Sequence, residues 1–439
     1  MKKTGLLAIA FMTIFSTYGQ IETTVFEQPY RLKADGKIID VVETGHSAPF
    51  IYDYNNDGKD DLLVGYFGKE RSDTDLVRGG HHLTKGGCNI YLNMGTNENP
   101  EYTFTGKLLA GGKQAYVPTD CCVGFVPRVA DLDGDGIDDI LSGSYPGQAY
   151  FYKGIGEGMY KAYQFLRDKT GKAMNPDHTT TITPFDWDED GDLDLVWGVR
   201  FKGTFVSFNT GSKTAPQFEA PKHIEMEKYG DKKMYELSSH SVPIDWDGDG
   251  HFDLVCGSEQ GDVFWYKNIG KKGSPKFGDP EMLIINNKRG HRTLEGDNSK
   301  PHGTRCKVFP YDYNNDGKLD LLIGDTYSTA DKAPKLTPEQ EIGLEELQSE
   351  YIMNPPEEIN ELNAKCAKFA NVRYKELMDN NADLTETEAR GLAWMDLPED
   401  LLIPLKKYYK KAAEDLKDYF KLKSGQPYSH GYVWVYIRK

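Results

Sequence analysis

The sequence predicts an all-β fold built from five repeated units of four antiparallel strands, with an α-helical insertion in the last unit. Three observations support this prediction. One acidic motif occurs five times, aromatic-rich strands follow it, and the two ends of the chain carry strand segments that complete one another. Internal repeats are typical of folds that stack one small unit many times.

The motif reads Asp, any residue, Asp or Asn, any, Asp, Gly, any two, Asp, two aliphatic residues, any, Gly. Oxygen atoms at positions 1, 3, 5 and 9, with a backbone carbonyl at position 7, can surround a hard cation. The glycine at position 6 permits a tight bend that a side chain would block. Calcium accepts a loose oxygen geometry better than magnesium does, so we expect up to five structural Ca²⁺ ions. The candidate metal ligands are Asp53, Asn55, Asp57, Asp61, Asp131, Asp133, Asp135, Asp139, Asp186, Asp188, Asp190, Asp194, Asp245, Asp247, Asp249, Asp253, Asp312, Asn314, Asp316 and Asp320.

Two other interpretations of the motif are less well supported. Solvated Asp-Gly turns would explain a single copy, because both residues favour turns. Five copies that all keep the ninth aspartate argue against that explanation. An EF-hand requires a bidentate glutamate at position 12. The twelfth residues here are Val64, Ser142, Trp197, Cys256 and Ile323.

These loops resemble the FG-GAP or VCBS repeat family, the calcium-loop repeats of integrin-type β-propellers. The resemblance covers most of residues 21–336 and the last ten residues. It implies a propeller with bound calcium, and it implies no activity, because function resides in sites added to a fold.

The strand pattern predicts five blades. Each unit has a strand before the acidic loop, a strand after it, an aromatic third strand and a fourth strand, which is the composition of a propeller blade. The fourth strands carry Phe-x-x-Pro, which also occurs at 26–29 before any loop, and the chain ends at 432–439 on a third strand without a fourth. We therefore expect the N-terminal strand to close the last blade. The predicted boundaries are a propeller over 20–336, a helical insertion over 337–425 and a closing strand over 426–439.

Two insertions interrupt the repeats, at 67–88 and at about 328–431. Capping boxes at Thr337 and Thr385 predict helices in the second insertion. Apolar residues at helical spacing support the same prediction; they are Ile359, Leu362, Cys366, Phe369, Leu402, Leu405, Tyr409 and Leu416. A coiled-coil partner site is the alternative to a solvated helical lid.

The first 19 residues predict a cleaved secretory signal. Lys2 and Lys3 precede an apolar run over 6–15 and small exit residues. We therefore expect a monomeric periplasmic or secreted protein without a membrane span. The net charge of -16 argues against a nucleic-acid partner. Among six cysteines, Cys256 and Cys306 are expected as buried thiols, whereas Cys121 and Cys122 could pair with each other, or one of them could pair with Cys88.

The resemblance places the acidic loops at one face, so residues flanking the other strand ends should gather at the opposite face. Catalytic candidates there are His178, His240, His302 and Tyr145. Candidates for substrate binding are Arg200, Arg128, Arg305, His46, Lys202 and Glu259. Cationic and titratable groups in a concave mouth are typical of a binding site.

Such a mouth on an exported acidic protein suits an anionic carbohydrate, containing uronate or sulfate. β-Elimination across a uronate requires cations that offset the carboxylate and a base near neutral pKa. We therefore expect a lyase or dehydratase. The alternative is a glycan-binding or adhesion propeller without catalysis. A carboxylate hydrolase is less well supported, because Glu259 and Asp325 are the only acidic residues expected at the mouth outside the insertions.

Overall fold

The computed structural model describes most of the chain. The described residues are 25–41, 45–68, 84–119, 122–226, 239–286, 293–294, 302–330, 332, 335–349, 355–381, 384, 386–424 and 427–439. The predicted signal segment and the predicted cap at Thr385 lie outside these ranges.

The main strands form five sheets within the described residues, and each sheet has a core of four strands. Sheet 1 contains β4 (Ala48–Tyr52), β5 (Asp61–Tyr66), β6 (Thr84–Asn93), β7 (Tyr102–Lys107), β2 (Lys33–Ala34), β3 (Lys37–Ile38) and β10 (Val117–Thr119). Sheet 2 contains β11 (Arg128–Ala130), β12 (Asp139–Ser142), β13 (Tyr150–Tyr152) and β14 (Gln164–Phe165). Sheet 3 contains β15 (Thr180–Phe185), β16 (Asp194–Val199), β17 (Gly203–Ser207) and β18 (Lys222–His223).

The last two sheets follow the same order. Sheet 4 contains β19 (His240–Ile244), β20 (Asp253–Gly257), β21 (Val263–Tyr266) and β22 (Glu281–Ile284). Sheet 5 contains β24 (Thr304–Tyr311), β25 (Asp320–Ala330), β27 (Val433–Tyr436), β1 (Tyr30–Arg31), β23 (Thr293–Leu294) and β26 (Pro427–His430). A separate two-stranded sheet contains β8 (Leu109–Ala110) and β9 (Lys113–Gln114).

The sheets pack in a propeller-like circuit because of the two adjacent aliphatic residues in each motif. Neighbouring residues of a strand point to opposite faces of the sheet. Leu62 therefore packs in the core shared with sheet 5, whereas Leu63 packs in the core shared with sheet 2. The other four motifs behave in the same way, so that five apolar cores link sheet 1 to 2, 2 to 3, 3 to 4, 4 to 5 and 5 to 1.

The final glycine of each motif lets the next sheet approach closely. A Cβ atom on Gly65 would lie 1.8 Å from the carbonyl oxygen of Phe125, and one on Gly143 would lie 2.3 Å from that of Thr180. Gly198, Gly257 and Gly324 face the following sheet at comparably short distances. Any side chain at these positions would push the neighbouring sheet away.

The N-terminal strand completes sheet 5, as the complementary ends of the sequence predict. Strand β1 pairs antiparallel with β27, with Arg31 opposite Trp434. The Arg31 guanidinium carbon lies 4.0 Å from the ring centroid of Tyr432 and 4.6 Å from that of Trp434. These cation–π contacts, together with the backbone pairing, hold the first strand in place.

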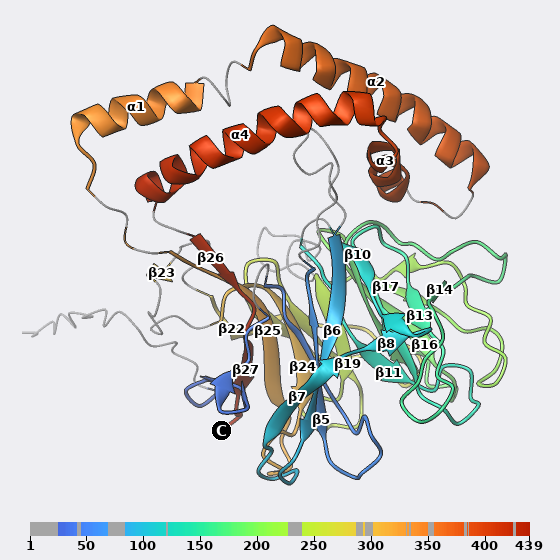
Figure 1. Ribbon diagram of the computed structural model, residues 1–439. Helices are drawn as coiled ribbons and strands as arrows, with labels where there is room; N and C mark the ends of the chain where they lie inside the picture. The colour runs from blue at the N-terminus through green and yellow to red at the C-terminus, as the bar shows by residue number, and fades with distance from the viewer. Residues whose placement is uncertain are drawn as a thin grey trace, which may run out of the picture.

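In the described part of the insertion between β25 and β26, the chain forms four helices. Their bounds are α1 (Pro338–Gln348), α2 (Glu357–Asn380), α3 (Glu386–Met395) and α4 (Glu399–Ser424). The capping box at Thr337 forms as predicted. Ile359, Cys366, Leu402 and Leu405 pack in a separate apolar core of α2, α3 and α4. Figure 1 shows the helices gathered beyond the ends of β10 and β26, away from the loop between β4 and β5.

The structure excludes one of the disulfide pairings that the sequence left open. Cys88, Cys256, Cys306 and Cys366 are free and buried. Cys122 is disulfide-bonded. Because Cys88 is free, the predicted alternative in which Cys121 or Cys122 pairs with Cys88 is wrong, and Cys121 itself lies outside the described residues. Among the described helices, none combines the length and the hydropathy that crossing a membrane requires.

Candidate functional site

An arc of charged side chains lies at the strand ends opposite the acidic loops. We call this arc the mouth; its members are His46, Tyr145, Asp177, His178, Arg200, Lys202, Glu259 and Arg305. Connectivity explains the location, because the strand that leaves each acidic loop ends at the far side of its sheet. Arg200 directly follows β16, and Glu259 follows β20 by two residues.

One half of the mouth contains a histidine–carboxylate pair. His178 Nδ1 lies 2.5 Å from Asp177 Oδ1, and Lys202 Nζ forms an ion pair with Asp177 Oδ2. Burial would raise the pKa of Asp177, but the bonds from Lys202 and His178 outweigh burial and lower this pKa. The Asp177 carboxylate therefore stays ionised and holds the proton of His178 on Nδ1. Half of the His178 side chain is exposed, and its ring lies 6.4 Å from that of Tyr145.

The other half of the mouth contains two arginines that share one carboxylate. Glu259 Oε2 lies 3.0 Å from Arg200 Nε and 3.5 Å from Arg305 Nε. Arg305 Nη1 lies 2.7 Å from His46 Nε2, which is buried against Phe67. The backbone N–H of Arg200 donates to the carbonyl of Thr179, next to His178, so the two halves are continuous. Arg200, Arg305 and Lys202 are cationic and Asp177 and Glu259 are anionic, so the side chains that define the arc carry one more positive charge than negative charges.

Left-handed backbone occurs both at this arc and at the acidic loops. His46, Thr179, Phe201 and Arg305 have φ values of 61°, 60°, 60° and 57°, and Asn56, Glu189 and Asn315 in the acidic loops have 59°, 58° and 56°. Residues with side chains rarely adopt this conformation.

Arg128 and His240 lie below the mouth, in the interior. Arg128 is 2 % exposed and His240 is fully buried. Arg128 Nη2 lies 2.8 Å from His240 Nε2, and the backbone N–H of Val308 donates to His240 Nδ1 at 3.0 Å. Burial, with the charges of Arg128 and Lys307, holds the pKa of His240 well below its ordinary value. His240 is therefore neutral and has no access to a polymer, which does not support its predicted role as base.

His302 also has a structural environment. Its Nδ1 lies 2.5 Å from the Tyr436 hydroxyl, and its Nε2 lies 2.5 Å from the carbonyl oxygen of Gly261. The carbonyl can only accept, so Nε2 carries the proton and Nδ1 accepts from Tyr436. Both ring nitrogens are engaged and the side chain is buried. This geometry does not support His302 as a catalytic base.

His302 should instead make the fold sensitive to acid. Burial lowers the pKa of His302 to about 4 from an ordinary 6.5. Between these values the unfolded chain binds more protons than the folded chain, so stability decreases as the pH decreases. We expect His302→Gln to reduce the stability loss between pH 7 and pH 5 by about 2 kcal/mol. Urea unfolding of both proteins at saturating calcium measures the difference. Asp325, whose pKa burial raises to about 6, acts in the opposite direction in both proteins. An equal loss in the two proteins would contradict the assignment.

The structure thus brings together His46, Tyr145, His178, Arg200, Lys202, Glu259 and Arg305, and it separates Arg128, His240 and His302 from them. Two important residues were not predicted. Asp177 could have been found as the acidic neighbour of His178. Lys307 is 3 % exposed on β24, and its alternation with Arg305 was the available signal.

The acidic loops lie at the other face and have one common geometry. In every loop, the first aspartate accepts hydrogen bonds from the backbone N–H groups of positions 5 and 6. In the second loop, Asp131 accepts from Asp135 at 3.0 Å and from Gly136 at 3.0 Å. The glycine at position 6 has a positive φ in all five loops; the values are 84° for Gly58, 85° for Gly136, 102° for Gly191, 87° for Gly250 and 86° for Gly317. The positive φ values confirm the prediction that position 6 requires a glycine for a tight bend.

Three loops bring carboxylates close enough to hold a metal ion. In each cluster, ligand atoms of positions 1, 3 and 9 lie within 4.8 Å of one another. The clusters are Asp131, Asp133 and Asp139; Asp186, Asp188 and Asp194; and Asp245, Asp247 and Asp253. The first and fifth loops have Asn55 and Asn314 at position 3 instead of a carboxylate. The carboxylates at position 5 are absent from these clusters and accept the backbone N–H of position 7, as Asp190 does from Asp192.

These three clusters fit a cation. Asp133 Oδ1 and Asp188 Oδ1 are buried and have no hydrogen-bond partner among the described residues. Burial raises the pKa of Asp139 and of Asp194 to about 6. A cation at these sites would satisfy the oxygen atoms and favour the ionised carboxylates.

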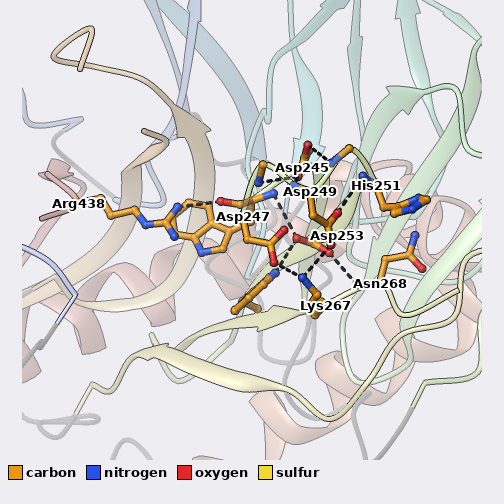
Figure 2. Close-up of polar contacts among 12 residues, drawn as sticks. Asp245, Asp247, Asp249, His251, Asp253, Lys267, Asn268 and Arg438 are labelled. Atoms are coloured by element: carbon orange, nitrogen blue, oxygen red, sulfur yellow. Dashed lines mark hydrogen bonds and ion pairs between the residues drawn. The ribbon is translucent and has the colours of Figure 1, made fainter. Parts of the chain in front are cut away.

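Lysines approach two of the clusters. Figure 2 shows the loop that begins at Asp245, where Lys267 forms ion pairs with Asp247 and Asp249. Lys153 forms the corresponding pairs with Asp133 and Asp135. Of the three acidic clusters, only the one at Asp186 has no lysine paired with the carboxylates at positions 3 and 5, among the ion pairs of the described residues. His251 points away from the cluster in Figure 2, as expected for a position that offers only its backbone carbonyl.

The propeller-like circuit of sheets and the acidic loops are the features of a repeat protein whose loops can bind metal ions. A comparison with protein families finds the FG-GAP-like repeat at residues 131–197 and 245–323. The chain therefore contains FG-GAP-like repeats, which confirms the resemblance found in the sequence.

Solved structures with partial similarity are known. One is an Agrocybe aegerita lectin that recognises non-reducing terminal N-acetylglucosamine, at 17% identity and a TM-score of 0.31, covering 68% of this chain and 79% of the lectin. Another is the V. cholerae biofilm matrix protein Bap1, at 14% identity and a TM-score of 0.25, covering 70% of this chain and 38% of Bap1. A comparison with curated proteins found no match.

Proposed function

We propose that this chain is an exported, monomeric, calcium-binding propeller of five blades that binds an anionic carbohydrate at the mouth and cleaves it by β-elimination. The observation that carries the proposal is the positively charged arc with a histidine–carboxylate pair at one end. Sugar carboxylates would pair with Arg200 and Arg305, and Lys202 adds a third positive charge nearby.

The residues of the mouth support a specific reaction. A uronate carboxylate held by Arg200 and Arg305 makes its C5 proton more acidic, because the guanidinium groups stabilise the developing negative charge. His178 Nε2 takes that proton while Asp177 holds the proton on Nδ1. A double bond then forms between C4 and C5, and the C4–O bond breaks. The leaving oxygen receives a proton from Tyr145, whose ring lies beside that of His178.

Calcium would have a structural role. The clusters that begin at Asp131, Asp186 and Asp245 would hold the ions, at the face opposite the mouth. Ion binding at these loops stabilises the native state and holds the strand ends in the positions that form the mouth.

The test is a panel of acidic glycans, including polygalacturonate, alginate and sulfated polysaccharides, incubated with the mature chain. β-Elimination forms an unsaturated uronate that absorbs ultraviolet light, so product is measured directly. We expect absorbance to increase with at least one uronate polymer and to require calcium. The absence of product from every polymer in the panel would contradict the reaction.

Binding without catalysis is the second candidate. It is favoured by the burial of His240 and His302, which reduces the groups available for acid–base chemistry. Retained binding of an acidic glycan without any product would support this candidate, and the same panel therefore distinguishes the two functions.

A further inference from the structure

The innermost strands of all five sheets meet at one point below the mouth. Arg128 on β11 lies there with its Nε 3.3 Å from Thr183 Oγ1 on β15 and its Nη2 2.8 Å from His240 on β19. Its guanidinium carbon lies 5.4 Å from the Phe50 ring on β4 and 5.8 Å from the Phe309 ring on β24. The five sheets thus enclose one guanidinium group at the centre of the circuit.

The contact between Arg128 and His240 cannot be satisfied by the protein alone. Val308 N–H donates to His240 Nδ1, so a neutral ring carries its proton on Nε2. That proton then faces Arg128 Nη2, which is also a donor. The other neutral tautomer turns Nδ1–H against Val308 N–H, and a protonated ring has both conflicts. Every protonation state open to a buried histidine leaves two donors facing one another.

The charges around this point are also unbalanced. Arg128 donates to the carbonyl of Pro127, but no carboxylate of the described residues bonds or pairs with it. Lys307 is buried on the same strand as Phe309, and its ammonium group donates to the Arg305 carbonyl. Burial lowers the pKa of Arg128 to about 9 and also lowers that of Lys307, whose charge Glu259 partly offsets. Unpaired buried charges are costly, and they are normally neutralised by a partner.

We infer that a compact oxyanion, such as a sulfate, phosphate or carboxylate group, binds at the centre of the circuit and bridges Arg128 Nη2 and His240 Nε2–H. An oxygen atom of the anion, placed beside these two nitrogens, accepts a hydrogen bond from each of them, so that the two donors no longer face one another without an acceptor. Arg128 and His240 are buried, and charge-assisted hydrogen bonds are stronger in such an interior than in water. This inner site is distinct from the mouth and does not depend on carbohydrate binding there.

Isothermal titration of the full mature chain with sodium sulfate, at constant ionic strength, tests the inference. We expect binding at one site, weakened about tenfold or more in Arg128→Gln and in His240→Gln, because each substitution removes one charge-assisted or polar contact. Lys276→Gln, at an exposed lysine outside the mouth, is the control and should leave sulfate binding unchanged, whereas Lys202→Gln and Arg200→Gln show whether any sulfate binds at the mouth instead. Parallel titrations with phosphate and with galacturonate distinguish a free inorganic ion from a sugar carboxylate as the source of the oxyanion.

Three results would overturn the inference. One is the absence of binding by sulfate, phosphate and galacturonate alike. Another is unchanged sulfate affinity in Arg128→Gln, and a third is loss of binding only in the mouth variants. If Arg128→Gln does not fold, a crystal of the unaltered chain grown with selenate decides the matter. A selenium signal beside the Arg128 guanidinium and the His240 ring would support the site, and its absence there would exclude it. Failure of the glycan panel, in contrast, would affect only the mouth.

Discussion

Removal of calcium is expected to destabilise the folded chain by about 8 kcal/mol, because three acidic clusters each contribute about 2.7 kcal/mol at a hundredfold excess over the dissociation constant. The physical reason is the buried carboxylate oxygens of Asp133 and Asp188, which have no hydrogen-bond partner in the described structure. Denaturant unfolding followed by tryptophan fluorescence, with calcium and with a chelator, measures the change.

Asp188→Asn tests the cluster that begins at Asp186. In calcium the variant should lose about 2.7 kcal/mol, the contribution of one site. In chelator it should be as stable as the unaltered chain or more so, because burial and the charge of Asp190 already disfavour the ionised carboxylate and raise its pKa. Asp279→Asn, an exposed aspartate outside the loops, is the control and should respond to calcium normally. Equal destabilisation of Asp188→Asn in calcium and in chelator would show that the residue acts without a metal.

Replacement of His178 by glutamine is expected to reduce β-elimination by a factor of about 10²–10⁴, the usual contribution of a general base. The glutamine side chain keeps the approximate size of the imidazole and has no basic nitrogen. Since Arg200 and Arg305 remain, the affinity for the glycan should stay within about threefold. Initial rates from ultraviolet absorbance and binding by titration measure the two effects separately.

His251→Gln is the matched control for this substitution. His251 lies in an acidic loop at the opposite face and offers only its backbone carbonyl to a metal, so turnover should not change. A His178→Gln variant that still turns over at the original rate would remove the proposed base. A variant that loses binding and turnover together would assign His178 to substrate recognition.

The sequence alone determined the repeat and its local geometry. Position 6 must be glycine because its backbone is left-handed, and a turn of this kind can be recognised without knowing its neighbours. The closing strand was also predictable. The N-terminal segment that contains Phe26 and the C-terminal segment that ends at Lys439 each supply strands that complete the same four-stranded unit. The helices followed from spacing and from the cap at Thr337. All of these features depend on contacts within a unit or on a signal that repeats.

The sequence could not distinguish interior from mouth among the histidines. His46, His178, His240 and His302 occupy similar places before their strands, so their spacing predicted one shared face. The structure exposes His178 and buries His240 and His302. Burial depends on which residues arrive from strands distant in the sequence, such as Tyr436 against His302 and Val308 against His240. Those partners are separated by 134 and 68 residues.

The acidic pattern and the paired aliphatic residues therefore determined by themselves that this chain forms repeated sheets with oxygen-rich loops, because both signals act over a few residues. Only the tertiary structure decided which charges meet. The pairing of Glu259 with Arg200 and Arg305, and the opposition of Arg128 and His240, arise where strands from different sheets converge. Convergence of that kind is set by the packing of the whole circuit, and no local pattern in the sequence specifies it.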